Sequence, residues 1–229
     1  MKAAAIITAA GQGQRMNIPI KKQYLVLEGV PVLARTVNAF LPLEAFIGII
    51  VVVPPGEVEF AQKILKPFCP LDRLTLVEGG LRRQDSVFNG LQAVPAEAEL
   101  ICIHDGARPL VSRELILAAL EEGGKWGAVV PVIPVTDTLK EVDLDGIILA
   151  TLPRSRMRLA QTPQVFQQAL IRDAYRQANL LGIEASDDAY LLEILGTRVH
   201  TLAGDPRNIK ITGPHDLQAA AAFLKGEKE

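Results

Sequence analysis

Charged side chains suited to a phosphorylated ligand appear near the start of the chain. The stretch TAAGQGQRMNIPIKKQYL, residues 8–25, holds two glycines one residue apart and then three cations, Arg15, Lys21 and Lys22, without an acidic residue. Glycines let backbone N–H groups approach an anion, a guanidinium meets phosphate oxygens as a fork of donors, and lysines act as point charges. Three interpretations compete: a phosphate-binding loop, the cleavage region of a secretion signal, and a turn beside a solvated basic patch.

Two familiar phosphate motifs are absent from this stretch. A Walker A loop needs G-x-x-x-x-G-K-[ST], and the dinucleotide fingerprint needs a third glycine where Met16 stands. The apolar residues before the loop, 3–8, are few and mostly alanine, so a buried first strand explains them more simply than a signal peptide does. The two glycines alone therefore favour phosphate binding only slightly over a plain turn.

An acid and an arginine share a second short loop, within LICIHDGARPLVSREL (100–115). The predicted strand there ends at His104-Asp105, and ligands of open α/β sheets bind at the carboxyl ends of strands. Magnesium is usually held by one or two carboxylates together with substrate phosphates, so Asp105 with Arg108 suits a metal–phosphate ligand. A structural Asp–Arg pair in a turn explains the two residues equally well. His104 by itself is better explained as a packed or hydrogen-bonded histidine.

Two further stretches have both a structural and a functional interpretation. In EGGLRRQDSVFNGL (78–91), two glycines precede a predicted helix start, which suits a flat group lying against the backbone but also an ordinary turn with an N-cap. In GDPRNIKIT (204–212), Lys210 lies in a predicted short apolar strand, so its ammonium either reaches solvent or points into a site.

Apolar, β-rich runs alternate with helical patterns along the chain. Strands are predicted over 3–8, 46–53, 74–77, 100–103, 128–133 and 198–202. Helices are predicted over 30–41, 57–68, 83–94, 112–123, 167–181 and 187–195, and from Pro214 onward. Ser112 is a plausible start and Gly123-Gly124 a plausible stop of the fourth helix. Near-continuous apolar strands indicate burial on both faces, so the alternation predicts a doubly wound α/β fold with a mostly parallel central sheet flanked by helices.

The alternation stops after Ile133. Residues 134–155 contain two short alternating runs around Asp145-Gly146, which is a strong hairpin signal. A hairpin this polar should project from the sheet, either as a solvated excursion or as a dimerisation arm. The arm is favoured because an isolated hairpin is only marginally stable. No repeat or linker is evident, so residues 1–229 are predicted to form a single domain.

Bulk composition excludes several classes of protein. The 229 residues carry a net charge of −2, which argues against nucleic acid or a membrane surface as a partner. Two cysteines, Cys69 and Cys102, make no disulfide framework and indicate a cytoplasmic protein. No apolar run approaches the length of a membrane span.

The order of the motifs identifies a family. TAAGQGQRM is followed along the chain by KKQYLVLEGVPVLARTVNAF, EGGLRRQDSV, HDGARP, PVTDTLK, LPRSRMRLAQTPQVF and DPRNIKIT. Together these segments span nearly the whole chain and resemble the 2-C-methyl-D-erythritol 4-phosphate cytidylyltransferase family of the non-mevalonate isoprenoid pathway. The resemblance implies a Rossmann-like nucleotidyltransferase fold and a homodimer joined through the projecting β-arm. It also implies the reaction of CTP with methylerythritol phosphate, giving diphosphocytidyl-methylerythritol and pyrophosphate, with Mg²⁺ or another divalent metal.

The resemblance also implies which residues form the nucleotide side of the site. The implied nucleotide-binding residues are Ala9, Ala10, Gly11, Gly13, Gly80, Ser86 and Asp105. The implied catalytic residues are Arg15, Lys22 and Lys210. The first loop would hold CTP through backbone N–H groups, and the second glycine pair and the helix start would line the cytosine pocket. The cations would stabilise charge at the α-phosphorus.

Two departures from the family pattern concern this side. Many relatives have Pro-Lys-Gln, whereas here Ile20 and Lys21 separate Pro19 from Lys22. Lys22 is preferred as the catalytic lysine because it precedes Gln23, and Lys21 is its rival. Leu81 stands at a position that is polar in some members.

On the sugar-phosphate side the resemblance implies Asp105, Arg108, Thr138, Arg154 and Thr162. Thr138 and Arg154 would reach across the dimer, and Asp105 would also position Mg²⁺. Two other functions stay open. A sister cytidylyltransferase acting on a pentitol phosphate such as ribitol 5-phosphate would share the CTP loops, and a non-catalytic nucleotide-binding protein would share the scaffold.

Overall fold

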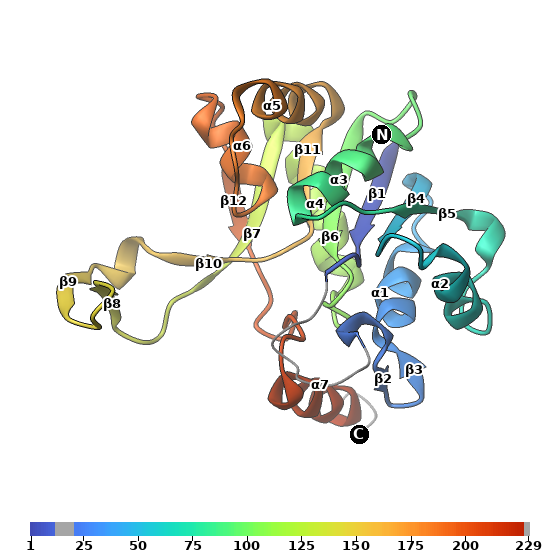
Figure 1. The fold of residues 1–229 in the computed structure, drawn as a ribbon, viewed down its shortest axis with the longest axis horizontal. Coiled ribbons are helices and arrows are strands. Elements are labelled where there is room, and N and C mark those ends of the chain that lie inside the picture. The colour runs from blue at the N-terminus through green and yellow to red at the C-terminus, as the bar shows by residue number, and fades with distance from the viewer. Residues whose placement is uncertain (12–20, 227–229) are drawn as a thin grey trace.

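The computed structural model describes residues 1–11 and 21–226. Among these residues, eight strands form one sheet in the order β10-β7-β11-β6-β1-β4-β5, with β12 paired to β7. The strands are β1 (Ala3–Thr8), β4 (Phe46–Val53), β5 (Leu74–Glu78), β6 (Leu100–Asp105), β7 (Ala128–Pro134), β10 (Arg158–Ala160), β11 (Gln164–Gln167) and β12 (His200–Ala203). Strands β4, β1 and β6 pair in parallel, whereas β11 runs antiparallel to both β6 and β7. The predicted mostly parallel sheet is confirmed, and it crosses the middle of the molecule in Figure 1.

Helices cover both faces of this sheet. The helices on one face are α1 (Val32–Phe40), α2 (Val58–Leu65) and α4 (Arg113–Trp126), and those on the other are α3 (Arg83–Gln92), α5 (Gln168–Leu181) and α6 (Asp188–Ile194). Strand β1 shows how the sequence achieves this. Ala5 and Ile7 pack into the first apolar cluster, whereas Ala4 and Ile6 pack into the second, because successive side chains of a strand point to opposite faces.

The C-terminal helix α7 (Pro214–Gly226) lies outside these two layers, below the end of β1 in Figure 1. A third apolar cluster, which includes Leu27, Val32, Ile211 and Ala220, packs it against the hairpin of β2 (Val26–Leu27) and β3 (Val30–Pro31). This packing brings the segment before α7 to the loop after β6, where the Ile211 N–H donates to the Ala107 carbonyl at 2.8 Å.

Two sequence predictions about local structure are wrong. RNIKIT (207–212) forms no strand, because the chain turns as it enters this stretch: the Asn208 N–H donates to the Asp205 carbonyl at 2.9 Å, and the Ile209 N–H to the Arg207 carbonyl at 2.7 Å. Helix α4 does not stop at Gly123-Gly124 but continues to Trp126 and ends at Gly127, whose φ is +82°. Gly123 serves close packing instead, since a Cβ there would lie 2.5 Å from the Val165 side chain on β11.

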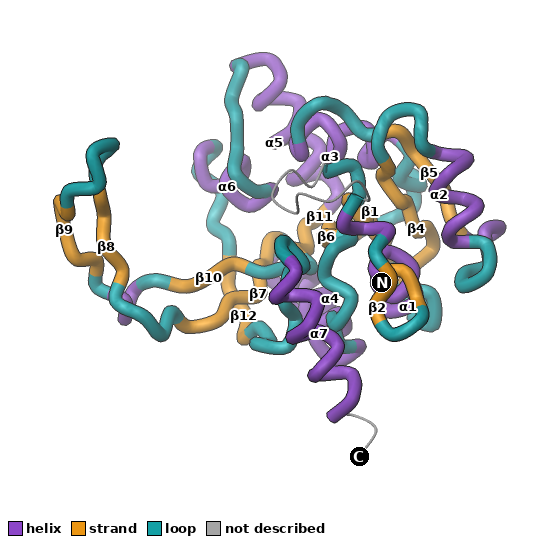
Figure 2. Tube along the Cα trace, turned by 60° about the horizontal axis from the view of Figure 1, so that its bottom comes forward, coloured by secondary structure: helices purple, strands orange, loops and turns teal. Residues whose placement is uncertain are grey.

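The predicted hairpin is present as β8 (Leu139–Val142) and β9 (Ile148–Leu152), with Gly146 at a φ of +81° in the turn. Figures 1 and 2 both show it projecting away from the rest of the chain. Large apolar side chains on the arm are exposed, namely Val142, Leu144, Ile147, Ile148 and Leu149.

Candidate active site

The candidate active site lies where the order of connections in the sheet reverses. From β1 the chain moves outward to β4 and β5, and it then returns through α3 to β6 on the other side of β1. Ligands of open α/β sheets bind in the crevice beyond such neighbouring strand ends. Thr8 and Asp105 end β1 and β6 as register partners, and the Gly106 N–H donates to the Thr8 carbonyl at 2.8 Å. The two strand ends therefore form one rim.

A cavity of about 350 Å³ opens at this rim. The predicted site residues that line it are Ala9, Ala10, Gly11, Lys22, Gly80, Ser86, Asp105 and Lys210. Leu81 also lines it and is 95% exposed. Gly13 and Arg15 lie outside the described residues. The fold thus gathers segments from Thr8 to Lys210 around one pocket.

The carboxylate of Asp105 is the electrostatic centre of this pocket. Lys210 Nζ lies 2.9 Å from its Oδ2, Arg108 Nε lies 3.4 Å from the same oxygen, and Arg83 Nε lies 3.5 Å from Oδ1. Burial alone would raise the pKa of Asp105, but the charges of Arg83, Lys210 and Arg108 outweigh it and hold that pKa well below its ordinary value. Asp105 is therefore an anion at neutral pH.

Arg108 lies behind the pocket wall and has a structural role. It is buried, its side chain pairs with Asp105, and its NH1 group donates to the Asn208 carbonyl at 2.7 Å. The structural Asp–Arg pair is therefore present, and Arg108 helps to hold the segment that carries Lys210 against the end of β6. Arg108 is not among the residues that line the cavity.

Behind Asp105 lies a buried, neutral hydrogen-bond network. The Thr162 hydroxyl accepts from the Asp105 N–H at 3.0 Å and lies 2.9 Å from Nδ1 of His104. His104 Nε2 lies 3.2 Å from the Arg108 carbonyl, which can only accept, so Nε2 carries the proton and Nδ1 accepts from Thr162. Burial lowers the pKa of His104 to about 4, which keeps the ring neutral at physiological pH. His104 is thus the hydrogen-bonded histidine expected from the sequence, and the Thr162 hydroxyl is already engaged within the protein.

The glycine pair after β5 allows two loops to touch. A Cβ on Gly79 would lie 2.4 Å from Cβ of Ala10, and a Cβ on Gly80 would lie 2.4 Å from Cβ of Asp85. The Gly80 N–H donates to the Ser86 hydroxyl at 3.1 Å, which fixes the loop to the first turn of α3. Neither position has room for a side chain. Glycine is therefore required there for the loop after β5 to lie this close to the loop after β1 and to the start of α3.

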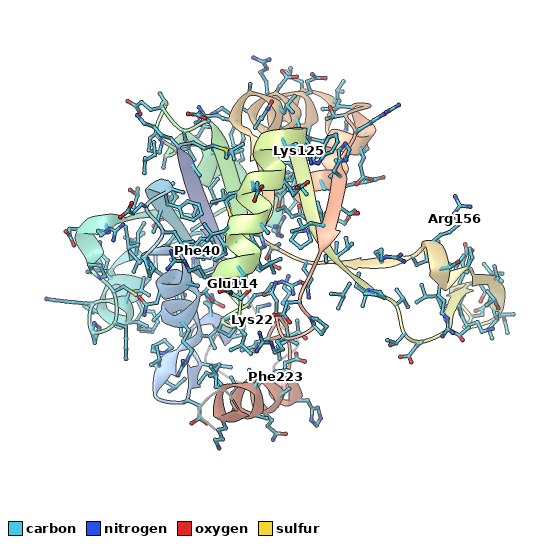
Figure 3. The ribbon with its side chains drawn as sticks, turned by 180° about the vertical axis from the view of Figure 1, so that it is seen from behind. Lys22, Phe40, Glu114, Lys125, Arg156 and Phe223 are labelled. Carbon is cyan, nitrogen blue, oxygen red and sulfur yellow. The ribbon has the colours of Figure 1, made fainter. Side chains whose placement is uncertain are left out.

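The two lysines after the undescribed segment differ in their surroundings. Lys21 makes an ion pair of 2.5 Å with Glu57, whose other oxygen accepts from the Tyr24 hydroxyl at 3.1 Å. Lys22 begins a short 3₁₀ helix (Lys22–Tyr24), and Figure 3 places it at the end of the sheet. Both lysines line the pocket. Gln23 is buried and donates to the Ala9 carbonyl at 2.7 Å, which joins this helix to the first loop.

The arm residues lie outside this pocket. Arg154 donates to the Thr136 carbonyl at 2.7 Å, in the segment that leads from the sheet to the arm. Figure 3 shows the neighbouring Arg156 on the arm, well away from Lys22. Neither Thr138 nor Arg154 is among the residues of this chain that line the cavity.

Sequence reasoning missed Arg83, which lines the pocket and pairs with both Asp105 and Asp188. The neighbouring Arg82 also lines the cavity, but its guanidinium pairs with the exposed acids Asp85 and Glu184. Two consecutive arginines at a helix start were the available signal: both line the cavity, but only Arg83, the first residue of α3, reaches Asp105.

Known proteins are similar to this chain along almost its whole length. A family model for 2-C-methyl-D-erythritol 4-phosphate cytidylyltransferase matches residues 3–226. The chain belongs to the 2-C-methyl-D-erythritol 4-phosphate cytidylyltransferase family. It is therefore a nucleotidyltransferase of isoprenoid precursor biosynthesis, and the family reaction joins CTP to 2-C-methyl-D-erythritol 4-phosphate with release of pyrophosphate.

Individual members of the cytidylyltransferase family are similar over the full chain. The enzyme of Desulforamulus reducens is 44% identical over 222 residues, which cover 96% of this chain and 95% of the relative. The enzyme of Caldanaerobacter subterraneus is 42% identical over 226 residues, which cover 98% of this chain and 100% of the relative.

Solved structures of the family agree with the fold. The crystal structure of the enzyme from Thermus thermophilus is 36% identical with a TM-score of 0.80, covering 98% of this chain and 100% of that one. The synthase from Anaerococcus prevotii is 31% identical with a TM-score of 0.85, covering 98% of both chains. No helix in the part of the chain that the structure describes is long and apolar enough to cross a membrane.

The neutral state of His104 predicts a titration. The His104 ring should titrate with a midpoint near 4 instead of its ordinary 6.5, measured by NMR. Between those pH values the unfolded chain binds a proton that the folded chain does not, so the free energy of unfolding should fall as pH falls, by about 3 kcal/mol in total from this residue. A midpoint near 6.5, or an unfolding free energy with the same pH dependence in His104→Gln, would contradict the assignment.

Proposed function

We propose that this pocket is where the chain joins CTP to 2-C-methyl-D-erythritol 4-phosphate, giving 4-diphosphocytidyl-2-C-methyl-D-erythritol and pyrophosphate. The observation that carries the proposal is the position of Asp105 and Lys210, 2.9 Å apart, in the lining of a pocket that the glycine loop after β1 also lines. The surplus of cations around this acid supplies a local positive field in a chain whose net charge is −2.

The transfer needs no nucleophile from the protein. A phosphate oxygen of the sugar phosphate attacks the α-phosphorus of CTP in line, the new P–O bond forms, and the bond to the β-phosphate breaks as pyrophosphate leaves. Lys210 and Lys22, with Arg15 from the undescribed segment, would stabilise the charge that builds on the α-phosphate. Catalysis is then positioning and electrostatic stabilisation.

The backbone of the first loop supports nucleotide binding. Ala9, Ala10 and Gly11 line the pocket together with Gly80, and the Ala9 N–H is already donated to the Val52 carbonyl at 2.7 Å, so further donors would come from the residues after it. We infer that this loop, continued by Gly13, holds the triphosphate through N–H groups, and that Gly80 and Ser86 lie against the base. Leu81 has an exposed side chain, so any contact it makes with the base would come from its backbone or its apolar surface.

Lys22 is the lysine that we assign to the phosphates. The ammonium group of Lys21 pairs with Glu57, and this carboxylate also accepts a hydrogen bond from Tyr24. Lys22 directly precedes Gln23, whose side-chain amide donates to the Ala9 carbonyl at 2.7 Å and so joins Lys22 to the first loop. We therefore prefer Lys22 for the triphosphate.

A magnesium ion fits this site only if substrate phosphates supply some of its ligands. The described residues contain no group of three or more His, Cys, Asp or Glu side chains that would hold a metal by themselves. Asp105 is the carboxylate on the pocket wall, and a Mg²⁺ ion usually takes one or two carboxylates together with substrate phosphates. Asp105 would therefore be its protein ligand, and the bound ion would neutralise triphosphate charge.

The sugar-phosphate side requires a second copy of the chain in this proposal. Thr138 and Arg154 belong to the arm region, and the arm carries exposed apolar side chains of the kind that a partner covers. Packing of the arm against a second copy would bring these two residues to a pocket that already holds Asp105, while Arg108 and Thr162 stay behind the wall.

A cytoplasmic location is also part of the proposal. Cys69 and Cys102 are both free and buried, as expected for a chain that folds in a reducing compartment.

Pyrophosphate release separates this function from its two alternatives. We expect release from CTP with 2-C-methyl-D-erythritol 4-phosphate and little with ribitol 5-phosphate. Faster release with the pentitol phosphate would identify the sister activity, and binding of CTP without release from either sugar phosphate would identify a non-catalytic nucleotide-binding protein.

Substitution of the two lysines tests the assignment within the pocket. Lys22→Ala should lower kcat by about 10²–10³, because it removes one group that stabilises transition-state charge. Lys21→Ala is the matched control and should lower kcat much less, with an unchanged melting temperature in both variants. A larger loss of kcat in Lys21→Ala would reverse the assignment.

The arm should determine the oligomeric state. Gel filtration should give twice the mass of the 24.8 kDa chain. Leu149→Asp on the arm should shift the protein toward the single-chain mass, because burial of a charge in an apolar interface is unfavourable. Leu180→Asp is the control: it replaces another exposed leucine, on α5 and not on the arm, and should stay dimeric. A single-chain mass for the unmodified protein would exclude the dimer.

A further inference from the structure

Asp188, the first residue of α6, is a buried acid that the proposed transfer does not use. It is 0% exposed. Its Oδ1 accepts from the Tyr175 hydroxyl at 2.5 Å, and its Oδ2 accepts from NH2 of Arg83 at 2.7 Å. A buried carboxylate is costly unless it is both paired and hydrogen-bonded, and Asp188 meets both conditions. The side chain is therefore a fixed anchor point and not a solvated surface acid.

Tyr175 is suited to support this anchor. Its side chain is buried on α5, and burial together with the charge of Asp188 raises its pKa well above the ordinary value, so the hydroxyl remains a donor. The ring is held in the core between α5 and the sheet, which fixes the position of the hydroxyl. Asp188 is thus oriented from one side by a rigid aromatic residue.

The other partner of Asp188 reaches the pocket. Arg83 lies at the start of α3 and lines the cavity, and its Nε faces Oδ1 of Asp105 at 3.5 Å while its NH2 meets Asp188. One planar guanidinium therefore connects a buried anchor on α6 to the functional carboxylate at the end of β6. An arginine presents several donors in a rigid fork, so two acids can orient it fully.

The three cations around Asp105 are not equivalent. Arg83 has a second anchor in Asp188, and Arg108 has one in the Asn208 carbonyl. Lys210 meets Asp105 with an ammonium on a flexible stem, and its side chain is 36% exposed, against 11% for Arg108. Lys210 is therefore the cation that can turn toward a phosphate, and the two arginines stay with Asp105.

The geometry points to Asp188, supported by the Tyr175 hydroxyl, as a positioning residue for the transfer: it holds Arg83 against Asp105, so that Asp105 keeps its place and its charge partners when Lys210 turns to the nucleotide phosphate. This inference rests on the proposed function of the pocket. Asp188 does not touch a substrate in this role, and its effect on the reaction passes through Arg83.

A double-mutant cycle tests whether Asp188 acts through Arg83. Asp188→Asn should lower kcat by about 10–100-fold, the usual effect of losing a group that orients an active-site side chain, with a smaller change in KM for CTP. Arg83→Met should lower kcat at least as much. The double variant should be no slower than Arg83→Met, because the anchor has no further effect once its guanidinium is gone.

The chain offers a matched control and a milder variant. Asp173→Asn removes an exposed acid that pairs with Arg176 on α5, away from the residues that line the cavity, and should leave kcat unchanged. Tyr175→Phe removes only the hydroxyl that supports Asp188, so it should lower kcat in the same direction and by less. If Asp188→Asn does not fold, the same cycle is measured with Tyr175→Phe and Arg83→Met.

Two results would overturn the inference. One is a double variant whose kcat is lowered by the product of the two single effects. The other is an Asp188→Asn variant that folds and turns over as fast as Asp173→Asn.

Failure of the proposed function would be seen separately. It would appear as absence of pyrophosphate release in the unmodified protein. The cycle would then be measured as CTP affinity by calorimetry, where additive effects of Asp188→Asn and Arg83→Met would overturn the positioning role and non-additive effects would support it.

Discussion

The site depends on one buried anion, the carboxylate of Asp105. A carboxylate at the end of a fully buried strand has lost most of its hydration, and only charged and hydrogen-bonded partners can compensate for that loss. Here the partners come from three separate segments, at Arg83, Arg108 and Lys210. Because each must reach the same two oxygens, their common acid determines where the start of α3, the loop after β6 and the segment before α7 lie. The pocket is the space that these segments enclose.

A neutral layer lies between this charged cluster and the apolar core. His104 and Thr162 satisfy each other and the backbone of Asp105 and Arg108 without adding a charge. A protonated imidazole at this place would add a further cation beside Arg108 and Lys210, and burial prevents it. The positive field therefore faces the pocket, where a phosphorylated substrate can use it, while the core behind it stays neutral.

The sheet could be predicted because its strands are long apolar runs. Ala3–Thr8, Phe46–Val53 and Leu100–Asp105 are buried along almost their whole length, so their composition alone separates them from the helices. Errors arose where a local signal had another use. The glycine pair at 123–124 resembles a helix stop, but it permits close packing on β11, and the apolar residues of RNIKIT serve the third cluster and not a strand. Such uses depend on contacts that a local pattern does not contain.

Like the fold, the candidate site has features that could be predicted from the sequence and features that could not. The sequence by itself determined the family, the α/β class, the glycine loops and the acid at the strand end, because each is a matter of residue type and order along the chain. Only the tertiary structure decided which charges meet. It paired Lys21 with Glu57, Arg82 with Glu184, and Arg83 with both Asp105 and Asp188. These pairings join residues tens of positions apart, and Coulomb and hydrogen-bond interactions act over a few ångströms of space regardless of separation along the chain.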